Sequence, residues 1–124
     1  MMDKFVKDIF EILVKILPSD WGSITLRITL GNNSHSMMFF VKDPYSARYY
    51  SFMDLQKMGI FTKYEFQNVS MRIGIISREY QQTFEKKWSG YTLVISRDGT
   101  SFVDFEFDQN IGSLSEDWKT RYLK

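Results

Sequence analysis

The sequence predicts an α+β protein with a mainly antiparallel sheet of about five strands. Three observations predict it: an amphipathic segment at the N-terminus, a longer one in the middle of the chain, and several short segments that alternate between apolar and polar residues. The expected order is helix, three strands, long helix, hairpin and short helix. Such a mixture favours a sheet covered on one face by helices. With no linker or repeat in its 124 residues, we expect one domain over residues 1–124.

The first helix is predicted over residues 3–17. Its apolar side chains, from Phe5 to Ile16, recur at the i, i+4, i+7 spacing that lines one face of a helix. Asp3 occupies the position of a capping carboxylate. Pro18 ends the helix, because the residue before a proline is pushed out of the α region.

Three strands are expected after this helix. Residues 23–30 alternate strictly between apolar and polar side chains, which is typical of a half-buried antiparallel strand. A polar turn at residues 31–33 leads to a second strand near residues 36–42. A third strand is expected at residues 48–53, so the three form a meander.

The long central helix is predicted over residues 63–88. Apolar side chains step by three and four from Phe66 through Ile73 to Trp88, which gives one wide apolar face. Gly74 weakens such a helix by about 1 kcal/mol relative to alanine without preventing it. The following Ser-Gly pair is a typical helix end.

A hairpin follows the long helix. Two alternating segments, residues 91–97 and 100–108, flank the dipeptide Asp98-Gly99, which type I′ turns prefer. Successive side chains of a strand point to opposite faces. Three carboxylates of the outgoing strand therefore share one face and are expected to project together into solvent: Asp104, Glu106 and Asp108.

Charge is distributed unevenly along the chain. Residues 98–117 contain six acidic residues and no lysine or arginine, whereas the whole chain has a net charge of +1. Such asymmetry indicates a charged partner, or simply a solvated strand face. We therefore treat the three strand carboxylates as candidate partner-binding residues.

The chain ends in a short predicted helix over residues 116–123, with Ser115 as the expected N-cap. Trp118 and Tyr122 are four residues apart, so both rings lie on the same side of the helix. They are candidate anchors for a partner. The alternative is that they fasten the helix to the sheet.

Composition excludes several classes of protein. The absence of cysteine excludes a disulfide framework, a thiolate metal site and a cysteine nucleophile. The N-terminus lacks the basic segment and unbroken apolar run of a secretory signal. No apolar run approaches the ~20 residues of a membrane span. We expect a soluble cytoplasmic protein.

Few residues could support catalysis. The single histidine, His35, lies in a polar patch at the start of a strand, where a solvated role is the ordinary one. The strand carboxylates would be spaced about 7 Å apart, too far for one small cation without further ligands. The scattered glycines form no phosphate-binding loop. We expect no enzyme activity, no cofactor and no metal.

Nucleic-acid binding has limited support. Arginine and lysine stand beside aromatic residues at residues 48–50 and 86–88, a mixture that single-stranded nucleic acid can stack on. The isoelectric point of about 7.9 and the acidic hairpin argue against direct binding of nucleic acid.

Three short motifs in order resemble the YezG-like immunity proteins. The first is Leu17-Pro18-x-Asp20-Trp21 after an amphipathic helix, and the second is the Asp98-Gly99-Thr100 turn followed by Phe102-x-x-Phe105-x-Phe107. The third is Trp118-x-x-Arg121-Tyr122-Leu123 in the terminal helix. The resemblance spans the whole chain. Two features depart from it: residues 54–62 match no part of the family pattern, and the chain is less acidic than we expect of this family.

The resemblance implies an antidote encoded beside a bacterial polymorphic toxin, including toxins of contact-dependent inhibition systems. It would bind the toxin, often a nuclease, stoichiometrically. Two other functions stay open at this point. One is a secretion chaperone or adaptor, and the other is a small enzyme that uses carboxylates to act on a nucleotide or sugar.

Overall fold

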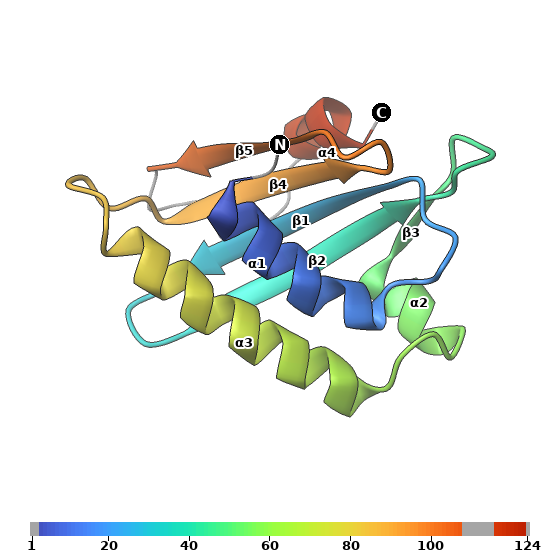
Figure 1. The fold of residues 1–124 in the computed structure, drawn as a ribbon, viewed down its shortest axis with the longest axis horizontal. Coiled ribbons are helices and arrows are strands. Elements are labelled where there is room, and N and C mark those ends of the chain that lie inside the picture. Colours follow the sequence, from blue (N-terminus) through green and yellow to red (C-terminus); the bar gives the residue numbers. More distant parts are fainter. Residues whose placement is uncertain (1–2, 108–115, 124) are drawn as a thin grey trace.

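A five-stranded sheet organises the computed structural model, which describes residues 3–107 and 116–123. The strand order is β3-β2-β1-β4-β5 and every neighbouring pair is antiparallel, as Figure 1 shows. The prediction of an α+β fold with an antiparallel sheet is confirmed. The strands are β1 (Ser23–Leu30), β2 (His35–Lys42), β3 (Tyr49–Ser51), β4 (Gly90–Ser96) and β5 (Ser101–Glu106).

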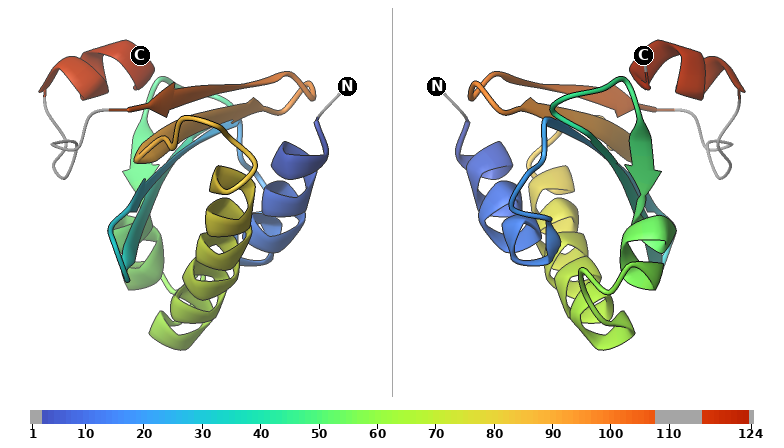
Figure 2. Two further views of the ribbon diagram at one scale, coloured as in Figure 1. Left: turned by 90° about the vertical axis from the view of Figure 1, so that its left-hand side faces the viewer. Right: turned by 90° about the vertical axis from the view of Figure 1, so that its right-hand side faces the viewer.

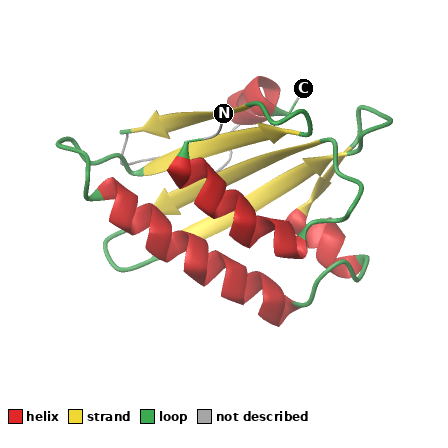
Figure 3. Ribbon diagram, viewed as in Figure 1, coloured by secondary structure: helices red, strands yellow, loops and turns green. Residues whose placement is uncertain are grey.

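Helices cover both faces of this sheet. Two helices, α1 and α3, lie side by side on one face, and α4 lies on the other (Figures 1 and 2). The expectation that helices cover one face alone is therefore wrong. The helices, coloured red in Figure 3, are α1 (Lys4–Leu13), α2 (Phe52–Lys57), α3 (Lys63–Gln81) and α4 (Glu116–Tyr122), with a 3₁₀ turn at Val14–Ile16.

The first strand, β1, lies at the centre and joins the two parts of the sheet. It pairs with β2 on one side and with β4 on the other, so Leu26 lies between Phe39 and Leu93. The strands that follow α3 in sequence thus extend the meander instead of forming a separate sheet. All three side chains are fully buried.

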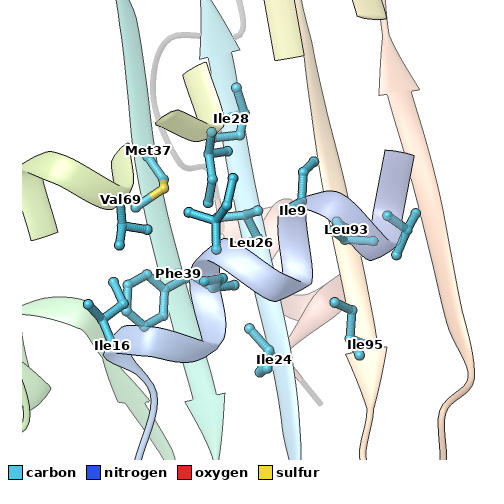
Figure 4. Packing of buried hydrophobic residues seen from close by; sticks show 14 of the residues in the cluster. Ile9, Ile16, Ile24, Leu26, Ile28, Met37, Phe39, Val69, Leu93 and Ile95 are labelled. Atoms are coloured by element: carbon cyan, nitrogen blue, oxygen red, sulfur yellow. The ribbon is translucent and has the colours of Figure 1, made fainter. Parts of the chain in front are cut away.

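The main core lies between the sheet and the helices α1 and α3. Figure 4 shows Ile9 of α1 and Val69 of α3 directed at the side chains of β1, β2 and β4. Aromatic rings extend this core toward β5, where Trp88 packs 5.0 Å from Phe105 between ring centroids. Trp88 is completely buried.

The N-terminal helix begins and ends near its predicted limits. The carboxylate of Asp3 accepts a hydrogen bond from the Phe5 N–H at 3.2 Å, which confirms the predicted cap. The α-helix ends at Leu13 and tightens into the 3₁₀ turn Val14–Ile16 before Pro18. The buried side is the predicted apolar stripe.

The third strand is shorter than predicted, because a helix begins within the expected range. Only Tyr49–Ser51 pairs with β2, and Phe52 starts α2. A reciprocal capping box sets this start: Ser51 Oγ accepts from the Asp54 N–H at 3.2 Å, and the Asp54 carboxylate accepts from the Ser51 N–H at 3.0 Å. The aromatic residues of this segment favour a strand, so the prediction did not include the capping box.

The central helix ends seven residues earlier than predicted. It begins with a second capping box between Thr62 and Glu65 and ends at Gln81. At the end, Thr83 Oγ1 donates to the Tyr80 carbonyl oxygen at 2.7 Å, and the Thr83 backbone N–H donates to the same oxygen at 3.0 Å. The chain then turns toward β4. Trp88 continues the apolar stripe of α3, but it lies in this turn and not in a helix.

A close contact explains the glycine inside α3. A Cβ added to Gly74 would come within 2.6 Å of the His35 imidazole. His35 Nε2 lies 2.9 Å from the Ser70 carbonyl oxygen and 3.2 Å from Ser70 Oγ. The histidine therefore docks the start of β2 onto α3, in place of the solvated role expected from sequence.

The β4–β5 turn differs from the predicted type. Type I′ turns need positive φ at both central residues. Here Gly99 has φ of +93° and no described residue other than glycine has a positive φ, so the type I′ prediction is wrong. The Gly99 N–H donates to the Ser96 carbonyl at 3.0 Å, and the Ser96 N–H donates to the Thr100 carbonyl at 2.8 Å. These bonds form a three-residue loop closed by a glycine bulge.

Candidate partner-binding surface

The candidate site residues gather on the sheet face that α4 covers, and we call this side the α4 face. Asp104 and Glu106 point to this side from β5, and Trp118 and Tyr122 reach it from α4. Asp104 is exposed and Glu106 is half-buried. Asp108 lies outside the described residues.

Glu106 is paired inside the protein. Its Oε1 lies 2.9 Å from Nη1 of Arg27, and its Oε2 lies 3.4 Å from Nη2. Arg27 belongs to β1, two strands away, and only 5% of it is exposed. Gly90 of β4, which has no side chain, lies opposite Glu106. For Glu106, the expected projection into solvent is therefore wrong.

Trp118 closes over this ion pair. Its indole N–H donates to Thr92 Oγ1 at 3.0 Å, and the Arg27 guanidinium carbon lies 5.6 Å from the ring centroid. The ring centroid of Phe40 is 5.9 Å from that of Trp118. Each of these partners belongs to a different strand, so a single ring ties α4 to β1, β2 and β4.

Tyr122 holds the second turn of α4 against β5. Its hydroxyl donates to the Asp104 carboxylate, and its ring lies 5.3 Å from Trp118 and 6.4 Å from Phe102. Burial raises the pKa of Tyr122, and the hydrogen bond to Asp104 raises it further. Both rings of α4 are more than nine-tenths buried. Their geometry fits the alternative that they fasten the helix to the sheet.

The acidic hairpin also has an ordered tip. Asp98 Oδ1 accepts from the Thr100 N–H at 2.9 Å and from Thr100 Oγ1 at 2.7 Å. These hydrogen bonds lower the pKa of Asp98, because they favour its ionised form. Two negative groups, Asp98 and Asp104, are thus presented at the surface of this half of the sheet.

Sequence reasoning missed Arg27 and Thr92, which organise the α4 face. Both are polar residues within strands, yet both are buried. A signal existed: an arginine in the middle of a strand, and a glutamate in a stretch without basic residues. Without the strand order, nothing indicated that they meet.

Within residues 3–107 and 116–123, no three acidic or histidine side chains gather closely enough to hold a metal ion. In the same part of the chain, no helix combines the length and the apolar character needed to cross a bilayer.

Comparison with known proteins gives the family. The family model described as "Immunity protein YezG-like" matches residues 2–123, which is essentially the whole chain. A search of curated proteins finds no match. The match includes the N-terminal helix, the hairpin and α4, the three regions whose motifs resembled this family in sequence. The chain belongs to the YezG-like immunity protein family.

Proposed function

We propose that this protein binds a cognate bacterial toxin in a stoichiometric complex and neutralises it. The observation that carries the proposal is the family match over residues 2–123, since an immunity protein acts by binding its toxin. It acts in the cytoplasm and without catalysis. In support, the only histidine holds β2 against α3, and the Glu106 carboxylate is already paired with Arg27.

The toxin is a nuclease delivered by a contact-dependent or related system. A nuclease site is basic because it must hold phosphates, so clustered carboxylates on an inhibitor attract it and increase the rate of encounter. The acidic stretch at residues 98–117 supplies a net charge of −6 within a chain that is otherwise basic.

The toxin docks on the α4 face and the adjoining edge of β5. Asp104 supplies negative charge there beside the exposed ring of Phe102, Glu106 is partly exposed but paired with Arg27, and Asp108 follows β5 in sequence. Trp118 and Tyr122 belong to the same surface. Because both rings are buried, they act mainly by holding α4 in position for the partner.

Co-expression with the product of the adjacent gene tests the proposal. Alone, that product should arrest growth, and with this protein it should be harmless. The two should leave gel filtration as one complex at equal stoichiometry. A harmless neighbour that still forms a complex would favour the chaperone or adaptor. A neighbour that is neither toxic nor bound would remove the proposed function.

Isosteric neutralisation of the strand carboxylates tests the docking surface. The variant combines Asp104→Asn and Asp108→Asn, which removes two charges and leaves the Glu106–Arg27 pair intact. We expect slower association with the toxin and a weaker dependence of that rate on salt. The matched control is Glu11→Gln, an exposed position of α1 on the opposite side of the sheet. Equal association rates for all three proteins would exclude this surface.

A further inference from the structure

The outer side of α3 carries large apolar side chains that no described element covers. Tyr64 is 82% exposed, Met71 52% and Ile75 55%. The buried side of the same helix includes Val69 and Ile73, on the opposite side of the helical wheel. Figure 2 shows α3 as an outer layer, beyond which no helix or strand is drawn. Met71 and Ile75 are neighbours on this side and Tyr64 lies two turns away, so this row is a candidate interaction surface.

These side chains follow the spacing of a helix–helix seam. Tyr64, Asn68, Met71 and Ile75 are separated by four, three and four residues, the a and d pattern of a heptad. We call these four residues the α3 stripe. Over its 11 residue steps the stripe runs about 16 Å along the helix.

We propose that the α3 stripe binds the α3 stripe of a second copy of this chain, with the two helices antiparallel. In a two-fold symmetric interface, the same patch must complement itself. The stripe does so when Tyr64 of one copy meets Ile75 of the other, because Asn68 then meets Met71. Apolar groups occupy both ends of this seam.

Charge selects this register. Glu65 and Arg72 lie on the same flank of the stripe, at the position beside the seam where antiparallel partners face each other. In the proposed register, Glu65 lies about 3 Å along the axis from Arg72 of the second copy. The two-fold axis repeats this contact, so the dimer gains two opposite-charge pairs.

Neighbouring registers oppose like charges. A shift of one heptad in one direction places Glu65 against Glu65 of the second copy. A shift in the other direction places Glu65 against Glu79 and Arg72 against itself. A parallel arrangement pairs Arg72 with the uncharged Gln67. Repulsion against wrong registers is a common source of specificity in paired helices.

Arg72 is half-buried beside Asp8 and Glu11 of α1, with which it lines a depression. Glu65 is exposed, and its Oε1 accepts the Thr62 N–H at 2.8 Å, which leaves the second oxygen free for a partner. Within the described part of the chain, Arg72 has no ion-pair partner within 4.0 Å. The proposal rests on these residues and is independent of the proposed function.

Sedimentation equilibrium tests the dimer. The wild-type mass should rise from 14.8 kDa toward twice that value at concentrations on the order of 100 μM, because so small an interface binds weakly. Met71→Glu places a carboxylate in the seam and should stay monomeric with an unchanged circular dichroism spectrum. The control Tyr45→Glu, at an 84% exposed tyrosine in the β2–β3 loop, should associate like the wild type.

A charge exchange tests the register. Arg72→Glu should weaken association about tenfold, because each of the two pairs becomes a contact between like charges. Glu65→Arg should do the same, and circular dichroism checks that α3 persists without the Glu65 carboxylate of its capping box. The double variant carrying both substitutions should associate like the wild type, since every pair is restored with its sign reversed. A purely structural role for either residue would give no such recovery.

Three results would overturn the proposal: a mass of 14.8 kDa at every concentration, unchanged association of Met71→Glu, or a double variant no better than its single parents. If Met71→Glu instead lost binding to the toxin while the wild type stayed monomeric, the stripe would belong to the toxin interface and the dimer would be rejected.

Discussion

The two faces of the sheet are buried by different means. Toward α1 and α3, β1 presents Ile24, Leu26 and Ile28, all fully buried among other apolar groups. Toward α4, the same strand presents Arg27, whose charge is paired with Glu106 and covered by a tryptophan ring. The first face depends on non-directional apolar burial, and the second on a few directed contacts.

The two faces therefore have different roles: the apolar face stabilises the fold, and the polar face fixes the position of α4. An apolar core tolerates rearrangement because any well-packed set of side chains satisfies it. A buried polar network is satisfied in one arrangement alone, since each donor needs its acceptor. The α4 face therefore fixes where α4 lies, and the opposite face supplies most of the free energy of folding.

The largest expected effect is on the apolar face. Leu26→Ala should reduce the free energy of unfolding by about 2–5 kcal/mol, because it removes buried carbon and leaves a cavity. Thr29→Ala, at the half-buried end of the same strand on the other face, should change it by less than about 1 kcal/mol. Urea denaturation measures both. Equal losses of unfolding free energy in the two variants would contradict the difference between the two faces.

The next effect concerns the ion pair. Glu106→Ala should cost about 1–3 kcal/mol, because Arg27 would keep its charge in a nearly buried site without a partner. Combining it with Arg27→Met should recover much of this loss, as an apolar side chain of similar length needs no partner. A double variant less stable than Glu106→Ala would show that the arginine stabilises the fold in another way.

The contact between His35 and Gly74 predicts a coupling free energy of about 1 kcal/mol between substitutions at the two positions. In the His35→Ala background, Gly74→Ala should stabilise the protein by about that amount, the usual helix preference for alanine over glycine. With His35 present, the new methyl group meets the imidazole and the gain should disappear. A double-mutant cycle by thermal denaturation measures this difference. Identical gains in both backgrounds would exclude the contact.

The smallest effect depends on pH. Tyr122→Phe should cost about 0.5–1.5 kcal/mol at neutral pH, the usual value of one hydrogen bond. Because folding raises the pKa of Tyr122, its contribution is fully present below the ordinary tyrosine pKa of about 10 and is lost as pH rises through the higher folded value. The difference in unfolding free energy between wild type and variant should therefore shrink above pH 10. A constant difference would place the hydroxyl outside the network.

Periodicity predicted most of the fold. The apolar stripe of α1 and the alternation of β1 gave both elements nearly to the residue, because each has one buried side with a clear period. The errors arose where local chemistry overrides the period. The cap at Ser51 starts a helix among aromatic residues, and Thr83 ends one inside an apolar stripe.

The candidate site was less predictable, because it depends on the strand order. Placing β4 beside β1 brings Arg27 within reach of Glu106, which is 79 residues away in sequence. The alternation of β5 correctly separated Asp104 from Phe105. It could not indicate that α4 would cover the carboxylates' side of the sheet, since a short amphipathic helix fits either face.

Hydrogen exchange of the protein in complex with its toxin shows which face of the sheet binds the toxin. We expect binding to slow exchange of backbone amides in β5 and α4, while amides of α1 keep their rates. Protection confined to α1 or α3, with β5 and α4 unchanged, would contradict the assignment of the α4 face as the toxin-binding surface.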